Sequence, residues 1–371
     1  MNNKNFETYI DYGSSKIRSV SINKNDYKNI FFYESDNYQN NSNTDEEIYK
    51  LISNVEKNTN EYLENINLMI DSSKMHAVSL SLSKIFDGSI LRNEDVKFLV
   101  QDARQQVLRN HFNKNIIHII VKRYKIDNIE YSFLPENINC NVLSIDILFI
   151  CLPKIYISQL KTFFSKYDVS INKIFCSSYV KSLSYKDNFD SIENICFVDI
   201  GFNKTSIIFY NNSEIIFFYI LPMGSNNITK DIAKVLDLDL VNAEKIKLYF
   251  EKDKSFLIKN ELSFETVLEI IISRVEEIFE LTKKKIKLNV ELDQFSNFSS
   301  VFIGQGSRIL DNKSIKNYLS LVEIDIFHES RSNFCECIIK LNNDFNKQEV
   351  ILIPKKQIKE GFFEKLFHFF R

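Results

Sequence analysis

Short apolar runs of strand length recur along the chain, and polar turns separate them. The most continuous of these runs, residues 147–152 and 215–221, each stop at a proline and are far too short to cross a bilayer. The first residues, MNNKNFETYIDYG, enter a strand pattern directly, without the charged and then apolar segment of a secretory signal. The pattern predicts an α/β protein without a transmembrane helix, and we expect it in the cytoplasm.

Apolar residues at helical spacing predict helices between these strands. Residues 93–109, a segment beginning near Lys154 and residues 264–288 all have this spacing. In the last of these, the face with Val267 and Ile271 should turn toward the core, while Arg274 should remain outside. Two β-rich runs around Asn211 and Asn212 predict a hairpin.

Two similar stretches, ETYIDYGSSKIRSVSIN at 7–23 and CFVDIGFNKTSIIFYNN at 196–212, indicate an internal duplication. Each is a β-rich run that ends in Asp, followed by one spacer, a Gly, a polar turn with Lys five positions after the Asp, and a second β-rich run. Asp11 and Asp199 are thus 188 positions apart (199 minus 11). A single copy would be read as an ordinary hairpin, whereas two copies favour two related lobes that bind phosphate and Mg²⁺ between them.

The residue types in the two turns suit a phosphate clamp. Asp11 and Asp199 are hard oxygen ligands that can hold a hydrated Mg²⁺. Gly13 and Gly201 would allow backbone N–H groups to approach phosphate oxygens closely. Hydroxyl donors and positive charges would complete the clamp, and they come from Ser14, Ser15, Thr205, Lys16 and Lys204. Glycine is scarce, with only 7 in the chain, so the loop glycines Gly13, Gly201, Gly224, Gly304 and Gly306 indicate places that need it.

These motifs, in this order, resemble the actin and Hsp70-like ATPases and, within them, the FtsA family of bacterial division proteins. The resemblance is carried by DYGSSKIRSV, VDIGFNKTSIIFYNN, LPMGSNNITKDIA, NAEKIK and VFIGQGSRI. It implies an actin-like ATPase fold, two duplicated lobes with ATP and Mg²⁺ in the cleft between them. It also implies that Glu244 and Lys247, one helical turn apart, contact the ribose, and that the adenine is framed by Gly304, Gly306, Ser307 and Arg308. Without the family, NAEKIK would be read as a solvated helix face and VFIGQGSRI as a strand-to-helix turn.

The resemblance also implies domain boundaries. Lobe one would comprise residues 1–83 and 154–190, interrupted by an inserted subdomain at 84–153. That position favours FtsA over MreB or Hsp70. Lobe two would comprise residues 191–225 and 295–340, with an upper subdomain at 226–294. A polar linker at 341–357 would lead to an amphipathic helix at 358–371.

The final segment would place its apolar side chains on one face of that helix, namely Ile358, Phe362, Phe363, Leu366, Phe367, Phe369 and Phe370. Basic residues precede it, so the helix suits the headgroup region of an anionic membrane, as the similar helix does in FtsA. The alternative is a terminal helix docked on its own core. The membrane interpretation makes the chain a peripheral protein of the cytoplasmic side of the inner membrane, at the division septum.

The family further implies protein partners. Its upper subdomain receives the C-terminal tail of FtsZ, and Arg274 lies near the family's contact arginine; the alternative is a solvated charged face. Actin-like lobes can also stack head to tail into polymers, and later division proteins are expected partners. The 47 basic and 49 acidic residues nearly cancel, which argues against nucleic acid.

Several positions depart from the family's pattern. Phe202 and Asn203 replace glycines in the second turn, Lys204 replaces a hydroxyl residue, Ser206 stands where the family is often acidic, and Gln305 replaces a glycine. We therefore assign no catalytic residue and expect ATP with Mg²⁺ to be a conformational ligand, hydrolysed slowly or not at all. Two alternatives remain: a PilM-type pilus scaffold, and a sugar-kinase-type phosphotransferase, for which the sequence lacks an acceptor-activating Asp motif.

Overall fold

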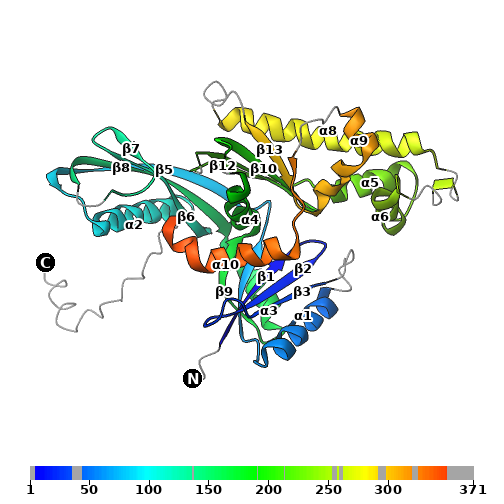
Figure 1. Cartoon of the computed structure of the whole chain (residues 1–371), viewed down its shortest axis with the longest axis horizontal. Helices are drawn as coiled ribbons and strands as arrows, with labels where there is room; N and C mark the ends of the chain where they lie inside the picture. Colours follow the sequence, from blue (N-terminus) through cyan, green and yellow to red (C-terminus); the bar gives the residue numbers. More distant parts are fainter. Residues whose placement is uncertain are drawn as a thin grey trace.

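The computed structural model describes residues 5–35, 44–135, 138–189, 191–212, 214–252, 257–258, 262–290, 298–319 and 325–348. Two five-stranded sheets lie at the centre of the molecule, and a four-stranded sheet extends from one side (Figure 1). The predicted helix at 358–371, with all seven of its apolar residues, lies outside the described residues.

The first sheet has the strand order β3-β2-β1-β4-β9. Strands β1 (Phe6–Tyr12), β2 (Ile17–Asn23) and β3 (Ile30–Glu34) are antiparallel, whereas β4 (Asn65–Ile70) and β9 (Ser170–Cys176) run parallel to β1. Helices α1 (Thr44–Thr59) and α3 (Lys154–Ser165) pack against it, and α4 (Ser177–Tyr185) begins directly after β9.

The second sheet repeats this topology in the order β12-β11-β10-β13-β14. Its hairpin strands are β10 (Asn194–Ile200), β11 (Thr205–Asn211) and β12 (Glu214–Leu221), and the parallel strands are β13 (Ser299–Ile303) and β14 (Asp325–Ile326). The predicted duplication and the hairpin at Asn211 and Asn212 are thereby confirmed. The chain has the actin-like ATPase fold.

The four-stranded sheet is inserted between β4 and α3. It is antiparallel, with the order β5-β8-β6-β7, and consists of β5 (His76–Ile90), β6 (Lys114–Ile126), β7 (Ile129–Tyr131) and β8 (Asn139–Pro153). Helix α2 (Asn93–Asn110) covers one face and buries a separate apolar core there. The sheet starts at His76, eight residues earlier than the boundary expected from sequence.

The second lobe also carries helices, of which the longest packs on the second sheet. They are α5 (Ser225–Val235), α6 (Leu240–Tyr249) and the long α8 (Phe264–Asn289), followed after β13 by the 3₁₀ helix η3 (Gln305–Asp311) and α9 (Lys313–Tyr318). Helix α8 buries the predicted face with Val267, Ile271, Val275 and Ile278. In the described part of the chain, no helix has both the length and the apolar character needed to cross a membrane.

Helix α10 (Arg331–Gln348) follows the last strand of the second sheet but packs against the first lobe. Phe334, which is 1% exposed, lies against the ring of Phe32 and beneath the Arg18 guanidinium, and Cys337 and Ile338 join the same core. In Figure 1 the helix runs between the inserted sheet and the first sheet. Residues 341–348, expected to begin a polar linker, instead continue this helix, because Leu341 and the residues before it have an apolar surface to cover.

We predict that Phe334→Ala lowers the free energy of unfolding by about 3–5 kcal/mol, because it leaves a cavity between α10 and β3. Phe112→Ala is the control, since Phe112 is 76% exposed and its loss should change stability by less than about 0.5 kcal/mol. Urea unfolding measures both. Equal effects of the two substitutions would show that α10 does not pack there in solution.

Candidate functional site

The two related hairpin turns face each other across the cleft between the lobes. Residues 13–16 join β1 to β2, and residues 201–204 join β10 to β11. Both turns line one inner pocket of about 110 Å³, together with the ends of β4 and η3 and the segment 327–329. The structure thus brings together Asp11, Gly13, Ser14, Ser15, Lys16, Asp199, Gly201, Lys204, Gly304 and Arg308 from the predicted set.

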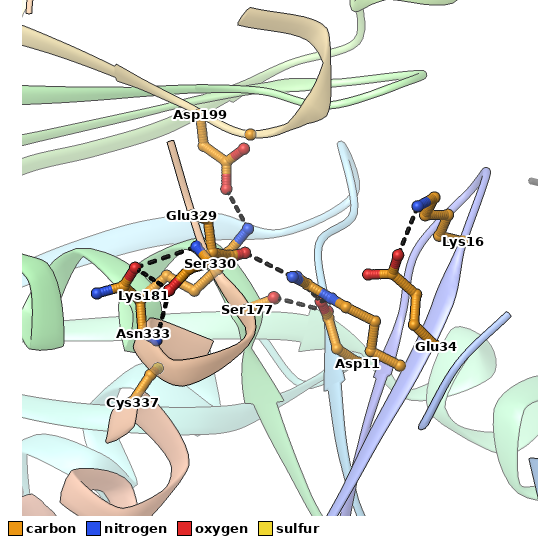
Figure 2. A network of polar contacts seen from close by, with 12 residues as sticks. Asp11, Lys16, Glu34, Ser177, Lys181, Asp199, Glu329, Ser330, Asn333 and Cys337 are labelled. Carbon is orange, nitrogen blue, oxygen red and sulfur yellow. Dashed lines mark hydrogen bonds and ion pairs between the residues drawn. The ribbon is translucent and has the colours of Figure 1, made fainter. Parts of the chain in front are cut away.

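Asp11 is held by groups from two other elements. Its Oδ2 accepts hydrogen bonds from Arg18 at 2.6 Å (Nη2) and 3.2 Å (Nε), because Asp11 and Arg18 are opposite each other in the β1–β2 register. Its Oδ1 accepts from the Ser177 hydroxyl at 2.7 Å, at the start of α4 (Figure 2). Burial alone would raise the pKa of this carboxyl, but Arg18 and Lys181 outweigh it and the net pKa is lowered.

Arg18 also pairs with Glu329, in the short segment between β14 and α10. Its Nη1 donates to Glu329 Oε2 at 2.5 Å, and the Arg18 and Glu329 side chains are only 13% and 9% exposed. Burial opposes ionisation of Glu329, yet Arg18 and Lys181 lower its pKa. Glu329 also accepts from the Tyr185 hydroxyl at 2.9 Å.

Asp199, the counterpart of Asp11, pairs with a buried lysine. Lys181 Nζ from α4 lies 2.6 Å from Asp199 Oδ2, and the two side chains are 8% and 6% exposed (Figure 2). Burial would lower the pKa of Lys181, but Asp199, Glu329 and Asp11 raise it above its ordinary value. Helix α4 therefore supplies a fixed cation between the two lobes.

A second lysine side chain reaches across the cleft, from the second lobe to the first. Lys204, from the second turn, donates to the backbone carbonyl of Asp71 at the end of β4. Its pKa is lowered chiefly by burial. The Asp71 carboxylate accepts from the backbone N–H (3.1 Å) and hydroxyl (2.9 Å) of Ser178. Lys16 remains at the edge of the pocket, 2.6 Å from Glu34 (Figure 2).

An outer groove of about 930 Å³ adjoins the inner pocket and shares Lys16, Phe202 and Arg308 with it. Its volume is in the range of about 300–1,000 Å³ that small-molecule sites occupy. Glu244 and Lys247 line it, on one face of α6 as predicted; their charged groups are 2.6 Å apart, and Lys247 also donates to Thr229 at 2.9 Å. Burial lowers the pKa of Lys247.

The predicted adenine loop lies between the two cavities. Gly304 has φ +88°, and a side chain there would meet Asp199 Oδ1 at 2.2 Å, so this position requires glycine. Ser307 is buried and donates to the Gly304 carbonyl at 2.7 Å. Gly306 and Arg308 line the outer groove, and Arg308 is exposed.

Thr205, predicted as a phosphate contact, and the loop glycine Gly224, also expected at the nucleotide site, contribute to the local structure instead. Thr205 is fully buried in β11 and donates to the Met223 carbonyl at 2.8 Å. Gly224 precedes α5 and packs tightly on the second turn: a side chain there would lie 2.6 Å from the carbonyl oxygens of Gly201 and Phe202. Neither residue is among those that line the two cavities.

Arg274 lies on α8, outside both cavities. Its guanidinium forms a two-pronged ion pair with Asp231 at 2.6 and 2.9 Å and also pairs with Glu277. These carboxylates raise the pKa of Arg274 and orient its side chain on the helix surface.

Sequence reasoning missed Arg18, Lys181, Glu329 and Ser177. Arg18 had a signal, since four turn residues place it opposite Asp11 in the hairpin. No sequence pattern indicated Lys181 and Glu329, because their positions depend on how α4 and the segment before α10 pack. All six cysteines are free, and the described residues contain no cluster of three His, Cys, Asp or Glu side chains able to hold a metal ion.

Comparison with known proteins finds similarity to one family. The model of the family "Cell division protein FtsA" matches residues 196–322, the segment that contains the second turn, the Glu244–Lys247 helix and the Gly304 loop. Over this segment the chain is similar to the FtsA proteins. FtsA of Buchnera aphidicola from Acyrthosiphon pisum is 21% identical over 319 residues, which are 78% of this chain and 75% of that protein.

Other matches are shorter. FtsA of Buchnera aphidicola from Schizaphis graminum is 22% identical over 209 residues, 52% of this chain and 49% of the relative. FtsA of Bacillus subtilis is also 22% identical over 209 residues, 52% of this chain and 47% of the relative. The chain thus matches about half the length of these two relatives. Among solved structures, a chain of the PilM-PilN type IV pilus biogenesis complex superposes with a TM-score of 0.60 over 90% of this chain and 96% of that chain, at 10% identity. This likeness supports the fold alone.

We predict that Arg18→Met lowers the free energy of unfolding by about 3–5 kcal/mol, because it leaves two largely buried carboxylates without their shared cation. Lys16→Met is the matched control. It removes the cation of the partly exposed Lys16–Glu34 pair, in the turn just before β2, and should cost at most about 1 kcal/mol. Urea unfolding at neutral pH compares the two. If both substitutions cost the same, Arg18 does not link Asp11 to Glu329 in solution.

Proposed function

We propose that the chain is an actin-like, ATP-binding division protein that anchors FtsZ filaments to the cytoplasmic face of the inner membrane and helps to recruit later division proteins. The observation that carries the proposal is that the segment matching the family model also forms much of the cleft. Residues 196–322 supply the second turn and most of the walls of the outer groove. The proposed location is peripheral, at the division septum.

The outer groove supports nucleotide binding. It combines a nucleotide-compatible volume with a buried Glu244–Lys247 pair and the exposed cation of Arg308 at its junction with the inner pocket. The altered second turn argues against efficient hydrolysis, since Phe202 and Lys204 occupy positions where the family has small or hydroxyl residues. We therefore propose ATP as a conformational ligand, and head-to-tail polymers as the form in which many weak membrane contacts act together.

A second candidate function is a PilM-like scaffold. The observation that favours it is the superposition on a chain of the PilM-PilN complex over almost the whole chain. Both candidates share the fold, so binding partners must separate them.

We predict that the full chain co-sediments with anionic liposomes, and that a chain cut after Lys356 does not. The physical reason is the apolar face from Ile358 to Phe370, which would lie in the headgroup boundary when residues 358–371 are helical. Neutral liposomes are the control for the basic residues before this segment. Equal behaviour of the two chains would contradict membrane anchoring by the tail.

We predict that a peptide with the acidic and apolar character of the FtsZ C-terminal tail binds the full chain, and that Arg274→Gln weakens this binding about tenfold. The substitution removes the one cation that Asp231 and Glu277 hold on this part of α8 while keeping its hydrogen-bonding capacity. Lys287→Gln, at an exposed position near the end of α8, is the control. Fluorescence anisotropy of a labelled peptide measures both, and absence of binding by the unaltered chain would favour the PilM-like alternative.

A further inference from the structure

The inner pocket contains its own counterions. Five basic and five acidic side chains line it, in addition to His328, so at neutral pH the formal charges of these ten side chains cancel. This balance differs from a site in which carboxylates await a divalent cation, because such a site carries an excess of negative charge until the metal is bound.

Both oxygens of Asp11 are already engaged. Oδ2 accepts from two nitrogens of Arg18, and Oδ1 accepts from Ser177 at 2.7 Å. The donors come from β2 and from the first residue of α4. A Mg²⁺ ion bound there, directly or through a water of its hydration shell, would have to share the carboxylate with the Arg18 guanidinium and the Ser177 hydroxyl.

Asp199 also has a cation of the chain as its partner. Lys181 Nζ lies 2.6 Å from Oδ2, while Oδ1 lies beside Gly304. Mg²⁺ requires near-octahedral oxygen coordination at about 2.0–2.1 Å and usually keeps several waters. Each aspartate is instead already paired with a cation of the chain, which does not fit a site that waits for a dication.

The cations that pair with these carboxylates belong to the chain itself. An arginine stays protonated at every pH of interest. Both cations are anchored on secondary structure, Arg18 in β2 and Lys181 in α4. A dication placed between them would be repelled by both.

We propose that Arg18 and Lys181 take the place of a divalent cation at Asp11 and Asp199, so that the cleft binds the phosphates of a nucleotide without Mg²⁺. The inference rests on the proposed nucleotide binding. It differs from a metal-dependent ATPase in that the nucleotide would bind without Mg²⁺. The chain's own cations neutralise the aspartates. Arg308, and Lys16 if it leaves its partner Glu34, lie at the edge of the inner pocket where they can meet the phosphates.

The first test is a titration of the full chain with a fluorescent ATP analogue, in millimolar Mg²⁺ and in excess EDTA. The proposal predicts dissociation constants that agree within about twofold in the two buffers. A dissociation constant that rises about tenfold or more in EDTA would overturn it.

The second test concerns the metal without a nucleotide. Mn²⁺ replaces Mg²⁺ as the probe, and electron paramagnetic resonance measures the free ion in the presence of the full chain. We expect Mn²⁺ to remain free, and stoichiometric binding would overturn the proposal. If ATP binds in neither buffer, the proposed nucleotide function fails, and this measurement still decides the metal question by itself.

Lys181→Met provides the converse experiment, with Lys173→Met at an exposed position of β9 as the control. Removing the buried ammonium leaves Asp199 without a counterion, so Mg²⁺ should now raise the melting temperature of this variant and not that of the control. If the folded variant showed no change in melting temperature with Mg²⁺, the proposal that Lys181 takes the place of the metal would be contradicted. Should it fail to fold, the two measurements on the unaltered chain remain decisive.

Discussion

The central constraint on this molecule is that two carboxylates, Asp11 and Asp199, end equivalent strands at the junction of the lobes and are almost completely removed from water. A buried charge without a partner costs several kcal/mol, so each carboxylate needs a cation held in a fixed position. Arg18 reaches Asp11 across the first hairpin, and Lys181 reaches Asp199 from α4. The packing of α4 between the two sheets therefore serves both carboxylates, because its first residue also donates to Asp11.

The duplicated topology explains why one helix can do this. Each lobe places its aspartate at the end of the central strand of a five-stranded sheet with the same strand order. The two strand ends consequently face each other, and α4 lies in the core that the two sheets share. Outside this region the lobes differ: the first carries an inserted sheet with its own core, and the second carries helices α5, α6 and α8.

Much of this arrangement was accessible from sequence. The repeated Asp-x-Gly turns fixed the two hairpins, and the spacing of Val267, Ile271 and Val275 identified the buried face of α8. The partners of the aspartates were not accessible in the same way. Counting the register would have paired Asp11 with Arg18, but Glu329 is 311 positions from Arg18, and no local pattern in SSYVKSLSY indicates that its lysine faces Asp199. Helix α10 was missed for a related reason, because its polar composition hides the few residues, Phe334 above all, that pack on the first lobe.

The route of the chain between the lobes has a mechanical consequence. The polypeptide crosses from one lobe to the other after α4 and again before α10, and these two crossings are in contact: the Tyr185 hydroxyl binds Glu329, and the rings of Tyr185 and Phe327 lie 4.8 Å apart. Two adjacent covalent connections define a hinge axis. Rotation about it would move residues near Tyr185 and Phe327 little, while the turns at the mouth of the cleft, such as that of Lys16, would move furthest. In such a rotation the aromatic contact at the crossings would be the pivot, and the links Lys181–Asp199 and Lys204–Asp71 would hold the lobes closed.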